Sequence, residues 1–176
     1  TAGLVLLSTQ RSDRGAYQAL FREQRVHKTY QAIAPYRPEL GFPREHHSRM
    51  QESGHFIRMH EVAGPPNSHT RLTLLEHNTH WARYQLEPIS GKRHQLRVHM
   101  AALGIGILGD GLYPEVNDAP EGDFSRPLRL LAQAIAFTDP LTQQQRHFHS
   151  QYTLGALPPE PAPSGQQTWQ GLPANA

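Results

Sequence analysis

The densest group of chemically useful side chains lies between Ser90 and Met100, where the sequence reads SGKRHQLRVHM. The serine and glycine turn the chain out of a strand, and cationic and amide side chains then open a helix. A helix N-terminus exposes unpaired N–H groups and the positive end of its dipole, so Lys92, Arg93 and His94 there favour a bound phosphate. Arg97 follows on the same helix face as His94. The segment therefore predicts a phosphate seat, with a solvated basic helix start as the plain alternative.

Several short strands and two helices must position this segment. Apolar runs, alternation and turn residues predict strands over residues 4–8, 29–34, 55–62, 70–75, 81–89, 128–137 and 146–149. The three-to-four spacing predicts helices over 16–23, capped by Asp13, and over 93–103, ending at Gly104. Asn78 is expected to form the hairpin turn 76–79, and residues 35–53 are expected to be a long loop. This order favours an α+β fold with a mixed, largely antiparallel sheet.

Composition limits the class of protein. The 176 residues fit one domain, which we place at 1–150, with a disordered tail at 157–176 that is rich in proline, alanine and glycine. No apolar run reaches the roughly 18 residues of a membrane helix, so no membrane partner is expected. With no cysteine, the chain has no disulfide or thiolate chemistry, and we expect a cytoplasmic monomer. Twelve histidines and a net charge of +2 permit a polyanionic partner.

The segment from Glu87 to Met100 resembles the signature of the RluA family of RNA pseudouridine synthases, which reads approximately T-G-R-x-H-Q-I-R-V-H. Leu103-Gly104, Ile107-Leu108-Gly109-Asp110 and Tyr113 then follow in the family's order and spacing. Lys28-Thr29-Tyr30-Gln31-Ala32 is similar to its K-x-Y-x-A strand, and Leu130-Leu131-Ala132 with Phe137 and Pro140 to its L-H-A…F-x-x-P strand. The resemblance covers residues 1–149. Lys92 stands where the family has arginine, so a bidentate phosphate contact there is less favoured.

Thr1-Ala2-Gly3-Leu4 resembles the end of the family's first motif, H-R-L-D-x-x-[ST]-[SA]-G. The resemblance places the motif's catalytic aspartate three residues before the position of Thr1. We therefore expect this chain to be the C-terminal part of a catalytic domain, inactive alone, whose parent protein is an enzyme.

The resemblance implies a reaction in which uracil is detached from its ribose, turned and rejoined through carbon, without metal or organic cofactor. The substrate would be a uridine in structured RNA, either ribosomal or transfer RNA. Such chemistry needs a carboxylate nucleophile, a cation beside it, an aromatic platform and a pocket for a flipped base.

The resemblance also assigns the candidate residues. Arg97 would be the cation that holds the aspartate ionised, and it would lack a partner in this chain. Tyr30 would be the platform and a possible proton acceptor, and Leu130 the apolar wall against the base; ordinary core packing is the alternative for both. His94 and Gln95 would contact the RNA, while Lys92 and Arg93 would add salt-sensitive affinity. Asp110 is expected to bond its own backbone, and His99 to be structural.

Metal binding and non-catalytic RNA binding are the two alternative functions. Zinc-binding helices favour a spacing of four, whereas His94 and His99 are five apart, and His147 and His149 look like a solvated pair on one strand face, so no metal site is expected. A non-catalytic RNA-binding domain derived from the same fold shares the basic segment and Tyr30. The residue at the aspartate position in the parent protein would separate that alternative from an enzyme.

Overall fold

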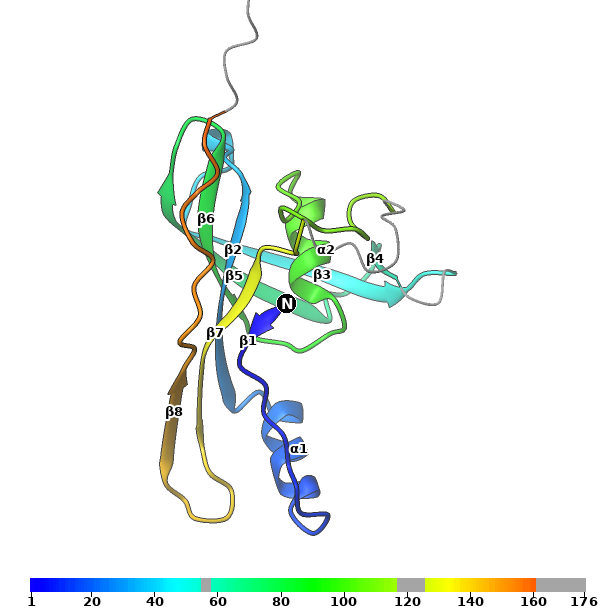
Figure 1. Cartoon of the computed structure of the whole chain (residues 1–176). Coiled ribbons are helices and arrows are strands. Elements are labelled where there is room, and N and C mark those ends of the chain that lie inside the picture. Colours follow the sequence, from blue (N-terminus) through cyan, green and yellow to red (C-terminus); the bar gives the residue numbers. More distant parts are fainter. Residues whose placement is uncertain (55–57, 117–125, 161–176) are drawn as a thin grey trace, which may run out of the picture.

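A curved sheet with the strand order β1-β7-β2-β6-β5-β3-β4 forms the body of the protein (Figure 1). This computed structural model describes residues 1–54, 58–116 and 126–160. Strand β1 pairs with β7 in parallel, and the other strand pairs are antiparallel. The predicted α+β class with a mixed, largely antiparallel sheet is confirmed. The strands are β1 (Ala2–Gly3), β2 (Val26–Pro35), β3 (Arg44–Glu52), β4 (Met59–Val62), β5 (Ser68–His77), β6 (Trp81–Pro88), β7 (Leu130–Thr138) and β8 (Gln145–His149).

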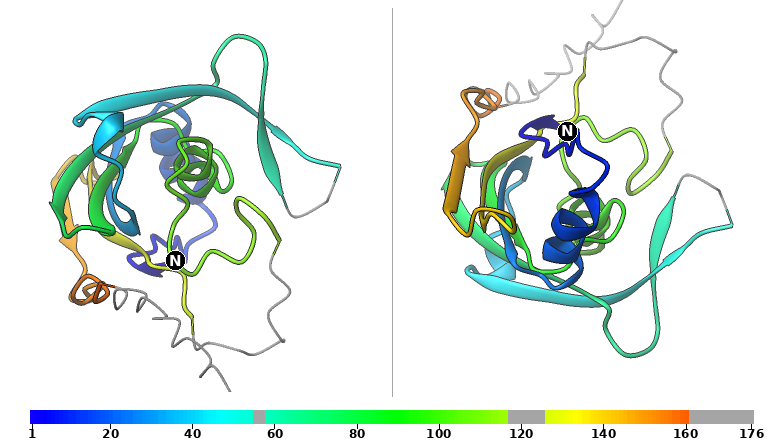
Figure 2. Two further views of the ribbon diagram at one scale, coloured as in Figure 1. Left: turned by 90° about the horizontal axis from the view of Figure 1, so that it is seen from above. Right: turned by 90° about the horizontal axis from the view of Figure 1, so that it is seen from below.

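The helices are α1 (Arg14–Arg22), α2 (Gln95–Ala102) and the short 3-10 helix η1 (Pro38–Leu40). Seen from above, the sheet curves around α2 (Figure 2). Every second residue of β6 is buried, as period-two alternation requires of a strand with one covered face. Leu96 and Met100, four residues apart on α2, share one core cluster with Tyr84 and Leu86 of β6. This packing fixes α2, and with it the basic segment, against the concave face.

The hairpin turn between β5 and β6 forms as predicted. The side-chain oxygen of Asn78 accepts hydrogen bonds from the amides of His80 and Trp81, at 3.0 and 2.8 Å. The positive φ of Gly104 ends α2 as expected. Strands β5, β6, β7 and β8 also lie where the alternation placed them, within a few residues.

Residues 35–53 are not a long loop, and that prediction was wrong. They hold the end of β2, then η1, and then the whole of β3. The inward positions of β3 are His46, Ser48 and Met50. Because two of these three are polar, the alternation of buried and exposed residues does not appear as an alternation of hydrophobicity.

Four smaller predictions also differ from the structure. Residues 4–8 are not a strand: β1 is Ala2–Gly3, and beyond the bond from the Leu4 amide to Ala132 the chain leaves β7. Helix α2 starts at Gln95 rather than at residue 93. The Asp13 side chain does not cap α1; it accepts a bond from Ser12 instead. The predicted strand 55–62 is β4 from Met59 onward, while residues 55–57 lie outside the described residues.

The predicted tail contains ordered residues at its start. Leu157 packs against a core cluster, the carbonyl of Pro158 accepts a bond from Asn78, and Glu160 accepts one from the Thr79 amide. Residues 161–176 lie outside the described residues. Within the described part of the chain, no helix combines the length and the apolar character that a membrane crossing requires.

Gly3 of β1 leaves no room for a side chain beside β7. Its φ is +95°, and a Cβ there would lie 2.3 Å from the carbonyl oxygen of Ala132. Because both the conformation and the space exclude a side chain, Gly3→Ala should lower the free energy of unfolding by about 1–3 kcal/mol. Urea denaturation monitored by circular dichroism measures this change.

Gly15 provides the matched control. It lies inside α1, and a Cβ there would meet nothing within 4 Å. Gly15→Ala should leave stability unchanged or raise it by roughly 0.5–1 kcal/mol. Equal destabilisation by the two substitutions would contradict the close approach of β1 to β7.

Candidate functional site

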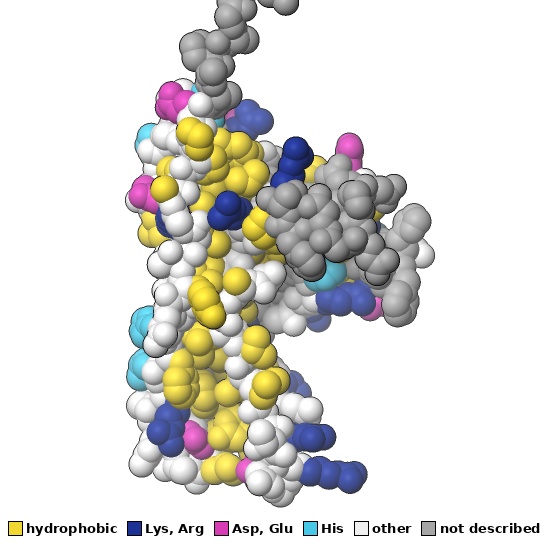
Figure 3. All heavy atoms as spheres, in the orientation of Figure 1, with side chains coloured by type: hydrophobic (Ala, Val, Ile, Leu, Met, Phe, Trp, Pro, Cys, Tyr) yellow, Lys and Arg dark blue, Asp and Glu magenta, His cyan; other side chains and the backbone are white. Residues whose placement is uncertain are grey.

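An open cleft of about 420 Å³ lies between α1 and the segment that opens α2. The space-filling view shows the molecule notched between the end that carries α1 and the part that carries α2, with Lys and Arg side chains on both sides of the notch (Figure 3). The volume of the cleft is in the usual range for small-molecule pockets. The lining residues come from four separated stretches of the chain: Thr1, Phe21, Lys28, Tyr30, Pro88, Ser90, Gly91, Lys92, His94, Gln95, Leu96, Arg97, Leu128 and Leu130.

Six of the seven residues named from the sequence line this cleft: Tyr30, Lys92, His94, Gln95, Arg97 and Leu130. The seventh, Arg93, is not part of the lining, and its guanidinium lies 3.5 Å from the carboxylate of Glu52. The fold thus brings together β2, the start of α2 and β7. The roles assigned to these residues remain predictions.

Arg97 has a partner in this chain, which corrects the expectation that it would lack one. Its Nε donates to Oδ2 of Asp110 at 2.7 Å, and its Nη2 donates to Oδ1. The Asp110 side chain is fully buried and that of Arg97 is 16% exposed. A two-pronged bond of this kind fixes the plane of the guanidinium as well as its position. Arg97 is therefore held rigidly at the cleft.

Asp110 is itself fixed by the turn that carries it. Its Oδ1 also accepts bonds from the amides of Leu112 and Tyr113, at 2.9 and 3.0 Å, as a carboxylate in a turn is expected to do. The preceding Gly109 has a φ of +77°, and a Cβ there would lie 2.3 Å from the Pro127 carbonyl oxygen. With its oxygens engaged, Asp110 has the environment of a structural anchor, not of a nucleophile.

Tyr30 and Leu130 lie on adjacent strands, β2 and β7, at one wall of the cleft. A β-bulge between Thr29 and Tyr30 shifts the register of β2 against β7 at this point, and bulges re-aim side chains. Burial raises the pKa of the Tyr30 phenol above its usual 10, so its hydroxyl is protonated at neutral pH. Leu130 is 3% exposed and belongs to the core cluster that Tyr30 packs against.

Lys28 is a cleft residue that the sequence argument missed. Its Nζ donates to the Ser90 carbonyl at 3.1 Å, and burial lowers the pKa of this amine. The spacing in the sequence could have identified it, because Lys28 lies two residues before Tyr30 on the same strand and so shares its face. The cleft therefore has a second lysine besides Lys92, placed at its inner wall.

Gln95 holds the turn that precedes α2. Its Oε1 accepts from the Ser90 hydroxyl at 2.7 Å and from the Lys92 amide at 3.0 Å. Its Nε2 donates to the His69 carbonyl and to the Thr70 hydroxyl. These four bonds use the full capacity of the amide. The structure gives Gln95 a positioning role, and a contact with RNA stays a prediction.

His94 and His99 differ in their surroundings. His94 precedes α2 with a φ of +54°, and its Nδ1 lies 3.1 Å from the Tyr113 hydroxyl. Burial, with Arg97 and Arg93 nearby, lowers the pKa of His94 and favours the neutral ring. His99 is fully buried and hydrogen-bonded to three hydroxyls, those of Ser48, Ser68 and Thr70. The expectation that His99 is structural agrees with this network.

Removing one charge of the buried Arg97–Asp110 pair tests how much the pair stabilises the fold. Asp110→Asn keeps an oxygen for the turn amides but leaves the Arg97 charge unpaired, so it should lower the free energy of unfolding by about 3–5 kcal/mol. Asp139 is the matched control, because its Oδ1 also accepts two turn amides, while its arginine partner, Arg146, is 39% exposed. Asp139→Asn should cost about 1 kcal/mol or less. Equal costs in urea denaturation would show that the turn, not the ion pair, matters.

Comparison with known proteins agrees with this arrangement. A family model described as RNA pseudouridylate synthase matches residues 1–102. The chain is 31% identical over 156 residues to the dual-specificity RNA pseudouridine synthase RluA of Pasteurella multocida, covering 84% of this chain and 67% of that protein. It is 29% identical over 152 residues to the ribosomal large subunit pseudouridine synthase C of Vibrio cholerae, covering 85% and 48%. The chain thus spans about half to two thirds of the length of these relatives.

A solved structure shares the fold. Human RNA pseudouridylate synthase domain containing 1 superposes with a TM-score of 0.65 at 24% sequence identity, over 81% of this chain and 61% of that one. Because the family model matches more than half of the sequence, and the cleft is built from the segments that carry the resemblance, the chain belongs to the RNA pseudouridylate synthase family.

Proposed function

We propose that the natural protein containing this chain is an RNA pseudouridine synthase, and that the cleft receives the uridine that reacts. The observation that carries the proposal is the convergence of Tyr30, Arg97 and Leu130 on one cleft, although they are separated by up to 100 residues of sequence. An aromatic ring, a fixed cation and an apolar wall are what a base withdrawn from its stack requires.

The position of Thr1 supports a place for the nucleophile. Thr1 lines the cleft, and β1 directly after it runs parallel to β7 beside Leu131 and Ala132. An aspartate three residues before Thr1 would be within roughly 10 Å of it along an extended chain. In this proposal the carboxylate attacks C1′ of the uridine and the bond from C1′ to N1 breaks. The freed uracil turns and bonds to C1′ through C5 as the carboxylate leaves, and the C5 proton is lost. Arg97, fixed by Asp110, holds the carboxylate ionised.

Charge in the cleft favours a polyanion. Lys28, Lys92 and Arg97 line the cleft, and the lining residues include no acidic side chain. Asp110 offsets the charge of Arg97, so the two lysines supply the remaining positive charge. We infer that Lys92, which is exposed, contacts an RNA phosphate, while Lys28 at the inner wall faces the nucleotide itself.

The RNA substrate is proposed to be ribosomal or transfer RNA. The name of the Vibrio relative refers to the large ribosomal subunit, and that of the Pasteurella relative to dual specificity. In the alternative function, a non-catalytic RNA-binding domain would bind RNA through the same basic cleft. The two functions differ in whether the bound uridine is converted.

Tyr30 tests the catalytic proposal in the natural protein. Tyr30→Phe keeps the ring and removes the hydroxyl, so RNA affinity should stay within about threefold while turnover falls at least tenfold, a loss typical of a group that takes part in proton transfer. Tritium release from RNA labelled at C5 of uridine measures turnover, and filter binding measures affinity.

Tyr36→Phe serves as the control, because Tyr36 stacks on His77 and lines a different hollow. That variant should match the wild type in both assays. If the wild-type protein binds ribosomal and transfer RNA but converts no uridine, the non-catalytic function replaces the one proposed. Full activity of Tyr30→Phe would exclude a role for the hydroxyl.

The phosphate contact of Lys92 is tested by salt. Each phosphate neutralised by a cation contributes about 0.7–0.9 to the slope of log K against log salt concentration. Lys92→Gln should therefore reduce the magnitude of that slope by about this amount. Arg37→Gln, which removes an exposed arginine outside the cleft lining, should leave the slope unchanged. An unchanged slope for Lys92→Gln would place the phosphate elsewhere.

A further inference from the structure

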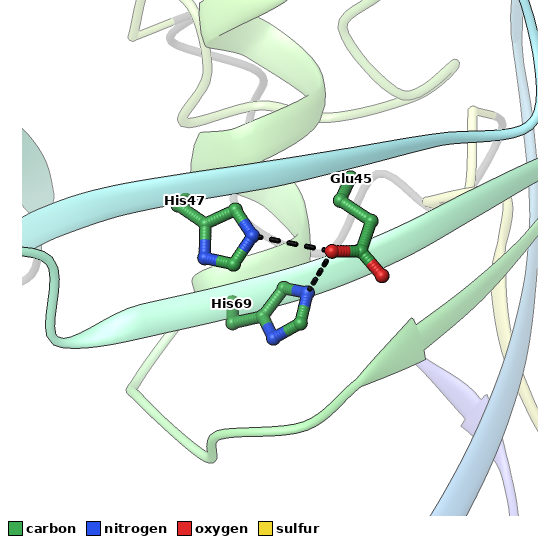
Figure 4. A group of neighbouring side chains, drawn as sticks. All are labelled: Glu45, His47 and His69. Atoms are coloured by element: carbon green, nitrogen blue, oxygen red, sulfur yellow. Dashed lines mark hydrogen bonds and ion pairs between the residues drawn. The ribbon is translucent and has the colours of Figure 1, made fainter.

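Three side chains with metal-binding atoms meet on strands β3 and β5, away from the cleft (Figure 4). Glu45 and His47 are two residues apart on β3, so they share one face of the strand. His69 lies directly opposite His47 in the register of β3 with β5. The ligating atoms of the three residues lie within 4.8 Å of one another.

The distances between these atoms fit a tetrahedral metal centre. Oε2 of Glu45 is 3.3 Å from Nε2 of His47 and 3.2 Å from Nε2 of His69. Zinc binds such nitrogen and oxygen atoms at about 2.0–2.1 Å, which in a tetrahedron separates neighbouring ligands by roughly 3.3 Å. The two imidazole rings are stacked, with centroids 3.9 Å apart, and Nε2 of each lies near the same carboxylate oxygen. Because the nitrogen lone pair lies in the plane of its ring, both rings would turn about their side-chain bonds to direct Nε2 at one ion.

His69 has a nitrogen that the fold leaves unsatisfied. Its Nε2 is buried and forms no hydrogen bond, although the Glu45 oxygen is 3.2 Å away. A buried nitrogen without a partner is unfavourable unless something else binds it.

Neighbouring bonds hold the ligands in place, and an ion would replace only the bond between Nε2 of His47 and Oε2 of Glu45, which is long at 3.3 Å. Arg71 donates to the other oxygen of Glu45, Oε1, at 2.8 Å, so Oε2 is the oxygen that faces the two rings. The His69 backbone is fixed at both polar groups, because its amide donates to Ser90 and its carbonyl accepts from Gln95 and Ile89. Support of this kind around the ligands is typical of built metal sites.

The geometry points to a zinc site formed by Glu45, His47 and His69, with a water molecule as the fourth ligand on the exposed side of His47. It lies across the sheet from α2, because Ser48 and Ser68, the next residues along each strand, contact His99 of that helix. The ion therefore takes no part in the uridine chemistry. It joins β3 to β5 at the residue whose backbone anchors the turn before α2.

A second group of possible ligands, His46, Glu61 and His99, lies on the side of the sheet facing α2. His99 Nε2 already has two hydroxyl partners there, and His46 bonds Glu61 at 2.8 Å. These atoms are satisfied by the protein, unlike Nε2 of His69. Histidine spacing within α2 and within β8 gave no sign of zinc, because the ligands of this site come from two paired strands.

Isothermal titration calorimetry of the metal-free natural protein with zinc chloride tests the site. One ion should bind, and its affinity should fall at least about tenfold in His47→Ala and in Glu45→Gln, since even the loss of an outer partner commonly costs that much. Both side chains are about half exposed, so the variants should fold. Zinc at a hundredfold excess over its dissociation constant should raise the Tm of the wild type by about 5 °C or more.

Two variants locate the ion. The double variant His147→Ala/His149→Ala removes an exposed histidine pair on β8 that has the same two-residue spacing as Glu45 and His47. Glu61→Gln alters the second group of possible ligands. Both variants should bind zinc as the wild type does. Long-range ¹H–¹⁵N spectra should show zinc-dependent shifts at Nε2 of His47 and His69. Loss of binding in Glu61→Gln but not in His47→Ala would overturn the proposal, as would equal binding by all variants. These readouts do not depend on pseudouridine formation.

Discussion

The buried pair of Arg97 and Asp110 is the interaction on which the candidate site depends. It joins helix α2 to the turn that follows it, and it fixes a cation at the cleft. Taking two charges out of water is costly, and the cost is offset here because Asp110 also accepts two amides. A hydrophobic pair could brace the helix equally well, but it would place no positive charge at the cleft. Under the proposed function, that charge is what holds the nucleophilic carboxylate ionised.

The fold was largely predictable where burial and hydrophobicity coincide. Strands β6 and β7 carry apolar residues at their buried positions, and α2 buries Leu96 and Met100. Strand β3 was not predicted because two of its inward residues are polar. His46 forms a hydrogen bond with Glu61, and Ser48 forms hydrogen bonds with Ser68 and His99. Residues 4–8 show the reverse case: they are apolar and were predicted to form a buried strand, but Val5 and Leu7 are each 78% exposed.

The candidate site was predictable from ordered motifs, but the partners of its residues were not. Tyr30, Lys92, His94, Gln95, Arg97 and Leu130 line one cleft, and the family resemblance had pointed to each of them. Asp110 was correctly expected to bond its own turn, yet its pairing with Arg97 depends on how the chain returns after α2. The role of Gln95 as a clamp likewise depends on His69 and Thr70 of β5. Such cross-element contacts have no local signal in the sequence.

The parallel pairing of β1 with β7 joins residues about 129 positions apart, since Ala2 is opposite Leu131. Contacts of such high sequence separation form late, because a long loop must close before they contribute. On the ribosome, at about 5–20 residues per second, β1 waits roughly 6–26 seconds for its partner strand to be made. Strands β2, β3, β5 and β6 can pair in that interval through antiparallel neighbours. The wall of the cleft formed by β1 and β7 is thus assembled last, onto a sheet that already exists.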